Sequence, residues 1–151
     1  MSNKPTFKEV IRPPFWLIAF LYFMLFSLVL AMWAALGNTA AINAFAISIV
    51  LGLVAIYLGT STIVVDGGEL RIKRAHIPIK YLGVSEVIDK KDFSFARTRG
   101  ADPAAYFATT FWISQGVKVE VNDERDPTPY WLISTKRGKE LIAAISAGKQ
   151  K

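Results

Sequence analysis

The sequence predicts a membrane α+β protein, in which a two-helix transmembrane hairpin is followed by a small, mainly antiparallel β domain with a C-terminal helix. Two observations lead to this fold class. No charged residue occurs from Pro13 to Val65, and about 20 apolar residues suffice for a helix to cross a bilayer core. Beyond that stretch, short runs alternate apolar with polar residues, as half-buried strands do.

We therefore divide the chain into four parts. Residues 1–14 form a cytoplasmic N-terminal segment, 15–59 the transmembrane hairpin, 60–148 a cytoplasmic β-rich domain, and 149–151 a tail.

The hairpin consists of two apolar runs, 15–36 and 40–58, separated by the uncharged turn 37–39. The first run exceeds the apolar core of about 7–15 residues in a cleaved signal peptide, which favours a retained span. No ionisable side chain lies inside either run, which argues against a channel, pump or transporter. Cations lie before the first run and after the second, so the positive-inside rule places both termini in the cytoplasm of a two-span protein. These cations are Lys4, Lys8, Arg12, Arg71, Lys73 and Arg74.

Small residues recur at every fourth position in both runs, which lets helix backbones approach closely. In a hairpin that turns near Asn38, the two stripes come into register, and Phe23 falls opposite Gly52. We expect the stripes to pack on each other or on a second protein. The predicted helix-packing residues are Ser27, Ala31, Ala35, Ala44, Ser48 and Gly52.

The β-rich domain begins with two alternating runs, 61–65 and 69–74, around Asp66-Gly67-Gly68, a pattern typical of a tight hairpin. Residues 76–81 predict a third strand, which Pro78 restricts to an edge or a bend. The apolar pattern then continues to Ile88 as either a strand or a short helix.

The second half of this domain starts with a polar, irregular segment, 89–107. Alternation predicts strands at 117–121 and 130–134, separated by a charged turn. Residues 136–147 predict a helix, with Ser134 or Thr135 as its N-cap and Gly148 as its stop. This order fits a small curved sheet that one helix closes at its open end.

We expect no catalytic, cofactor-binding or metal-binding residues in this chain. His76 is the only histidine and there is no cysteine, so a nucleophile with its base and orienting group cannot be assembled from recognisable motifs. The acidic residues Asp123, Glu124 and Asp126 lack a calcium-loop pattern and fit a solvated turn. The mild positive charge of residues 60–151 argues against nucleic acid and favours anionic lipid headgroups.

Two segments, 102–106 and 126–131, combine an Asp-Pro turn with aromatic residues. They form either a shared surface for a partner or ligand, or turns that the aspartates cap above packed rings. The candidate interaction surface comprises Asp102, Tyr106, Trp112, Asp126, Tyr130 and Trp131. The candidate lipid-headgroup contacts are Arg97, Arg99 and Lys118. In a third reading, Phe107, Phe111 and Trp112 lie against the bilayer beside Lys118.

Five motifs together with the hairpin resemble the actinobacterial membrane-protein family catalogued as domain of unknown function 3093, over about residues 12–147. The motifs are Ile77-Pro78-Ile79, Val84-Ser85-Glu86-Val87, residues 100–106, residues 117–121 and residues 126–135. Gly138 departs from the proline that relatives often carry. The resemblance implies an actinobacterial plasma membrane and brings no activity, ligand or catalytic residue. The order of strands and helix also resembles a bacterial pleckstrin-homology-like domain.

These observations predict a non-enzymatic scaffold or accessory subunit, whose partners are the lipid bilayer and a larger membrane complex. The first alternative is a lipid- or small-ligand-binding membrane protein. The second alternative is a membrane-associated enzyme.

Overall fold

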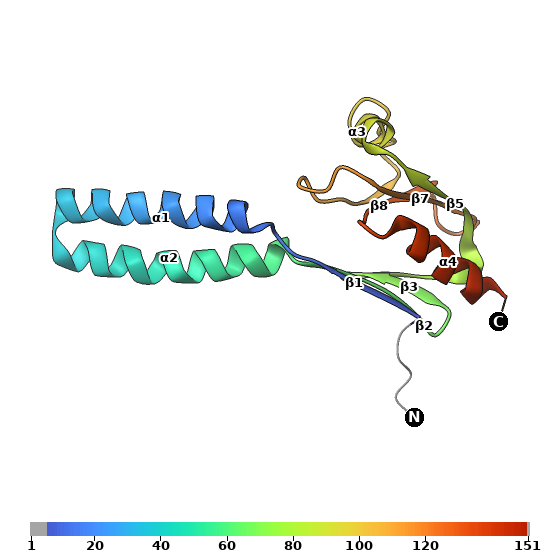
Figure 1. The fold of residues 1–151 in the computed structure, drawn as a ribbon, viewed down its shortest axis with the longest axis horizontal. Coiled ribbons are helices and arrows are strands. Elements are labelled where there is room, and N and C mark those ends of the chain that lie inside the picture. The colour runs from blue at the N-terminus through green and yellow to red at the C-terminus, as the bar shows by residue number, and fades with distance from the viewer. Residues whose placement is uncertain (1–5, 151) are drawn as a thin grey trace. The chain divides into compact units, whose positions relative to one another are not determined.

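The computed structural model describes residues 6–150, so the flanking charge Lys4 lies outside the described residues. The chain divides into two units (Figure 1). The helical unit is Arg12–Thr60. The β-rich unit combines the described residues up to Ile11 with those from Ser61 onward. The chain therefore leaves the β-rich unit for the helical one and returns to it.

The helical unit contains α1 (Phe15–Leu36) and α2 (Asn38–Gly59). Both helices are long and apolar enough to cross a membrane, by length and composition. Gly37 alone joins them, with a φ of +82° that glycine adopts readily. The predicted turn 37–39 is thus two residues too long. The indole Nε1 of Trp33 donates to Asn38 Oδ1 at 2.7 Å and links the two helices across this joint.

The predicted pairing of small-residue stripes is wrong for α1. Ser48 and Gly52 of α2 are buried, but the three small residues predicted on α1 are exposed: Ser27, Ala31 and Ala35. The partly buried side chains of α1 are larger and follow a helical spacing: Leu17, Ile18, Leu21, Tyr22, Leu25, Val29 and Met32. Large side chains of α1 therefore lie against the small-residue stripe of α2.

The register at Gly52 differs from the prediction by one residue. A Cβ on Gly52 would lie 2.6 Å from the Tyr22 hydroxyl oxygen, so Tyr22 occupies this groove. Phe23 is 63% exposed instead. The small-residue pattern alone does not determine how α1 is rotated about its axis, so it does not identify the residues that face α2.

The first sheet of the β-rich unit has the order β1-β2-β3-β4 and is antiparallel throughout. Its strands are β1 (Phe7–Ile11), β2 (Ser61–Asp66), β3 (Glu69–Ile72) and β4 (Ala75–Pro78). The β2–β3 turn has positive φ at Gly67 and Gly68, as the predicted tight hairpin requires. β4 is an edge strand, which agrees with the restriction that Pro78 imposes.

Strand β1 is absent from the sequence-based expectation, which places its five residues in the cytoplasmic N-terminal segment before the long apolar run. It alternates buried with exposed side chains and pairs with β2, with Ile11 opposite Ser61. The helical unit is therefore an insertion between two neighbouring strands.

The second sheet has the order β5-β7-β8-β6, in which only the β6–β8 pair is parallel. Its strands are β5 (Leu82–Ile88), β6 (Tyr106–Ala108), β7 (Gly116–Val121) and β8 (Tyr130–Ser134). A short 3-10 turn, η1 (Ile79–Tyr81), precedes β5. The open choice for residues 84–88 is thus resolved in favour of a strand.

The expectation of an irregular 89–107 segment is wrong at both ends, because α3 (Lys90–Arg97) forms at its start and β6 begins at Tyr106. The Asp89 carboxylate accepts hydrogen bonds from the backbone N–H groups of Lys91 and Asp92, both at 3.0 Å, and so caps the helix. Phe93 anchors α3, since its side chain is fully buried.

The C-terminal helix α4 spans Gly138–Lys149, later than the predicted 136–147. Neither predicted N-cap residue caps it. Ser134 Oγ accepts from the Thr110 N–H at 2.9 Å, and Thr135 bonds to Glu9. Gly148 does not stop the helix. A Cβ there would lie 2.6 Å from Ile79 Cδ1, so glycine makes room for that contact.

One hydrophobic core joins the two sheets and α4. Phe7 and Ile63 contribute from the first sheet, Val119 and Ile133 from the second, and Leu141 from α4. A smaller cluster of Ile88, Phe93 and Leu132 lies under α3.

Candidate functional site

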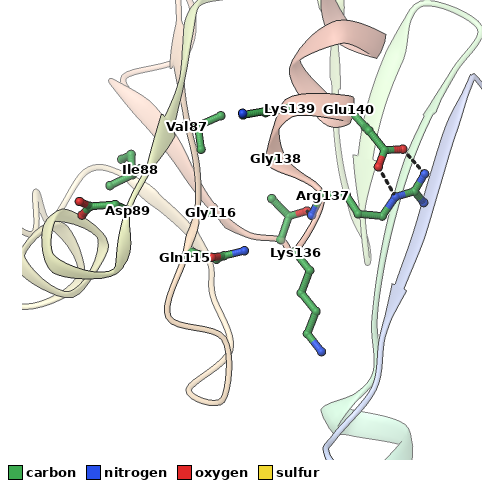
Figure 2. A pocket seen from close by; sticks show the side chains of 11 residues that line it. Val87, Ile88, Asp89, Gln115, Gly116, Lys136, Arg137, Gly138, Lys139 and Glu140 are labelled. Carbon is green, nitrogen blue, oxygen red and sulfur yellow. Dashed lines mark hydrogen bonds and ion pairs between the residues drawn. The ribbon is translucent and has the colours of Figure 1, made fainter.

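A hollow of about 490 Å³ lies at the N-terminus of α4 (Figure 2). Two of its polar side chains neutralise each other, because Arg137 and Glu140 form an ion pair. Arg137 thereby holds the pKa of the Glu140 carboxyl below its usual range. Figure 2 shows this pair turned away from Asp89 and Gln115.

The segment behind this hollow holds β1 in place. Glu9 is buried, and its carboxylate accepts from the Thr135 hydroxyl and from the Lys136 N–H, the latter at 3.1 Å. Arg137 Nη1 also donates to the Lys8 carbonyl at 3.3 Å. The polar groups here form hydrogen bonds that join β1 to the segment leading into α4. This hollow therefore has a structural role.

A second hollow, of about 760 Å³, lies against α3 and the loop that follows it. We call it the α3 hollow. Four cations line it: Lys90, Lys91, Arg97 and Arg99. The remaining lining residues are aromatic or hydroxyl-bearing: Phe93, Ser94, Phe95, Thr98 and Ser114. No carboxylate belongs to the lining, so this hollow is chemically suited to an anion.

Arg97 is the best-positioned of the four cations. Its Nη1 donates to the Thr110 carbonyl at 3.3 Å, and its guanidinium carbon lies 5.9 Å from the centre of the Phe93 ring. Since Phe93 is fully buried, it provides a rigid support for the guanidinium.

The structure brings together two of the three predicted lipid-headgroup contacts. Arg97 and Arg99 line the α3 hollow, whereas Lys118 lies elsewhere, with its Nζ 4.5 Å from the centre of the Tyr130 ring. Sequence reasoning missed Lys90, Lys91 and Phe95. An Asp89 cap followed by apolar residues at 93 and 96 was the signal that could have revealed the helix carrying them.

The predicted interaction surface is only partly accessible: Trp131 is buried, Asp126 is exposed, and the other four residues are half-buried. Trp131 is buried, and its ring centre lies 4.6 Å from that of Tyr106. The Tyr130 hydroxyl accepts from the Asp102 N–H at 3.3 Å, and the Asp102 carboxylate accepts from Ala104 N–H at 2.9 Å. These contacts support the reading in which aspartate caps the turn and rings pack beneath it.

Asp126 makes a turn of the same kind. Its Oδ1 accepts from the Thr128 N–H at 2.9 Å. Hydrogen bonds from the Thr128 side chain and backbone hold the pKa of the Asp126 carboxyl below its usual range. This stabilises a loop and does not require a ligand.

Trp112 contacts Phe111 edge-to-face, with ring centres 4.8 Å apart. Its indole Nε1 is buried without a hydrogen-bond partner among the described residues. Phe111 itself is 65% exposed. This segment therefore presents one aromatic ring to the surroundings and supports it with another.

Within residues 6–150, no group of three or more His, Cys, Asp or Glu side chains could hold a metal ion. His76 is exposed on β4, opposite Arg71 of β3.

The comparisons with known proteins identify a family. A family model described as a protein of unknown function (DUF3093) matches residues 6–145. Searches of curated proteins and of solved structures found no match.

Proposed function

Because the chain belongs to the DUF3093 family of unknown function, we propose its role from the structure. We propose a non-enzymatic integral membrane protein whose helical unit spans the plasma membrane twice. The β-rich unit acts at the cytoplasmic face, where it is a scaffold or an accessory subunit of a larger membrane complex.

The exposed apolar surface of the helical unit carries this proposal. α1 has no buried residue and α2 has only Ser48 and Gly52. Large side chains along both helices, such as Phe26 and Val50, are more than half exposed. Soluble monomers rarely expose apolar patches beyond a few hundred Å². A bilayer accepts such a surface, and helices satisfy their backbone hydrogen bonds internally, as lipid requires.

The orientation follows from charge and aromatic placement. Lys8 and Arg12 precede α1, and further cations follow α2, whereas Gly37 and its neighbours carry no charge. Trp16 and Trp33 lie near opposite ends of α1 and are both more than half exposed, as expected of rings in the two interfacial belts.

The form of the β-rich unit supports a binding module of the pleckstrin-homology-like kind. Two sheets share one core, and a C-terminal helix contributes to it. The carboxylates of Asp89, Asp102 and Asp126 each accept a hydrogen bond from the backbone N–H two residues further along the chain. These acidic groups therefore shape loops, which favours recognition over chemistry as the role of this unit.

Cysteine accessibility tests the membrane topology, and the chain has no cysteine of its own. Thr39→Cys at the start of α2 should react with a membrane-impermeant maleimide on intact cells. Ser146→Cys, at an exposed position of α4, should react only after the membrane is permeabilised. Gly67 is a poor site because its positive φ disfavours cysteine.

The reverse labelling pattern would contradict the orientation, and recovery of the chain in the soluble fraction would contradict insertion. The scaffold role has its own test, which is purification in native lipid followed by mass spectrometry. A protein retained at fixed stoichiometry supports that role, and the absence of any such protein contradicts it.

A further inference from the structure

The α3 hollow concentrates positive charge that no acidic side chain of its lining offsets. The whole sequence has 18 basic and 12 acidic residues, yet the lining has four cations and no carboxylate. Among the described residues, the side-chain ion pairs are Arg71–Glu69 and Arg137–Glu140, so none of the four cations belongs to one. An anion bound in this hollow would be attracted by all four cations.

The donors in the hollow suit a phosphate group. Arg97 uses its Nη1 on the Thr110 carbonyl, which fixes the guanidinium while its other N–H groups remain for a ligand. A guanidinium fork matches phosphate geometry, and lysine ammonium groups add point charges. The hydroxyls of Ser94 and Ser114 also line the hollow. Its size lies within the usual range for small-ligand sites.

Exposed phenylalanine beside these cations indicates a lipid as the source of the phosphate. Phe95 lines the hollow and is 59% exposed. Phe111 directly follows Thr110, which Arg97 contacts. These two are the large aromatic side chains most exposed in the described part of the β-rich unit. Free phosphate needs no apolar neighbour, whereas cations next to exposed phenylalanine are typical of segments that lie on an anionic bilayer.

We propose that the α3 hollow binds the phosphate of an anionic phospholipid headgroup, while Phe95 and Phe111 contact the acyl boundary. This goes beyond the scaffold role and rests on the proposed function in one respect, namely that the helical unit keeps the chain in a bilayer. Lys118 lies outside this site.

The test uses the full chain in nanodiscs of phosphatidylcholine, with or without phosphatidylglycerol. Ala101→Cys carries a fluorophore at an exposed position whose N–H bonds the Thr98 carbonyl, so the label lies beside the hollow without replacing a lining residue. Headgroup-spin-labelled lipid should quench this fluorophore more strongly when phosphatidylglycerol is present, and added salt should reverse the increase.

Two variants of equal net charge isolate the site. Lys90→Gln/Lys91→Gln/Arg99→Gln removes three lining cations and spares Arg97, which has a structural contact. Each cation near an anionic surface strengthens attachment several-fold, so the ratio of docked to undocked chain should fall by roughly a hundredfold. The control Arg74→Gln/Arg125→Gln/Lys139→Gln removes three exposed cations outside the hollow and should retain most of the docking.

Phe111→Ser separates a lipid from free phosphate. This substitution removes an exposed apolar ring, so it should weaken docking on anionic discs. It keeps all four cations, so any binding of inorganic phosphate should be unchanged. Equal quenching in the triple variant and its control would overturn the inference. The inference would also be overturned by two results together. Inorganic phosphate would reduce docking more than chloride at equal ionic strength, and Phe111→Ser would have no effect on docking. Failure of the chain to enter nanodiscs would instead contradict the membrane proposal.

Discussion

The two units contain similar apolar residues and use them in opposite ways. In the β-rich unit, Leu70, Val117 and Ile133 have no accessible surface, because two sheets and α4 enclose them. In the helical unit, comparable residues such as Leu28 and Val50 are more than half exposed. The apolar side chains are covered inside one unit, whereas the other leaves them uncovered, which is the basis of the membrane proposal. Substitutions of equal size should therefore have unequal effects in the two units.

The largest difference is expected for aromatic truncation. Trp131→Ala removes a buried ring that packs against Tyr106 and should destabilise the β-rich unit by about 3–5 kcal/mol. Phe23→Ala removes a side chain of α1 that is 63% exposed. It should leave the unfolding transition of the β-rich unit unchanged. Denaturant unfolding in detergent, followed by near-ultraviolet circular dichroism, measures both. Equal shifts would remove the distinction between the units.

A smaller effect is expected where the helical unit does pack internally. Gly52→Leu collides with Tyr22 and should weaken the α1–α2 contact by about 1–3 kcal/mol. Adding Tyr22→Ala should recover part of this loss, whereas adding Phe23→Ala should recover none. Proximity of spin labels at the two helix ends reports the contact. Recovery by Phe23→Ala instead would support the register expected from sequence.

The smallest effect is expected at an exposed turn. The Thr128 hydrogen bonds lower the pKa of Asp126 in the folded state, so their stabilisation is present above the unfolded pKa and is lost as the pH falls through the folded pKa. Asp126→Ala should cost less than about 1 kcal/mol at neutral pH, and this difference should shrink below about pH 4. Thermal unfolding at both pH values measures it.

His76→Gln is the matched control for this turn, since His76 is exposed on an edge strand. It should leave stability unchanged at both pH values. A loss of stability in His76→Gln larger than that in Asp126→Ala would contradict the structural role given to the Asp126 turn.

Sequence reasoning was most successful where one pattern determines one structure. The uncharged stretch gave both long helices, and the Asp66-Gly67-Gly68 turn gave the β2–β3 hairpin, because only glycine readily adopts two successive positive φ values. It failed for β1, whose five residues form a strand only because β2 returns beside them after the helical insertion. Such long-range pairing leaves little trace in a short segment.

The candidate site was predicted only in part for a related reason. Arg97 and Arg99 were selected as isolated cations, but Lys90 and Lys91 join them only because Asp89 caps a helix. The sequence leaves Trp131 as a candidate for a surface, because aromatic residues near Asp-Pro turns fit either a surface or a core. Burial against Tyr106 decides this choice, and it depends on the pairing of β6 with β8.

Solvent accessibility at two valines tests whether the helical unit lies in lipid while the β-rich unit lies in water. Val50 in α2 is 59% exposed and Val84 in β5 is 67% exposed, so the two form a matched pair. Each is replaced by cysteine and spin-labelled in reconstituted full-length chain, and collision with oxygen is compared with collision with a water-soluble nickel complex. Oxygen, which partitions into lipid, should dominate at Val50→Cys, and the nickel complex should dominate at Val84→Cys. Equal access of the nickel complex to both labels would contradict this prediction, because the helical unit would then be in water.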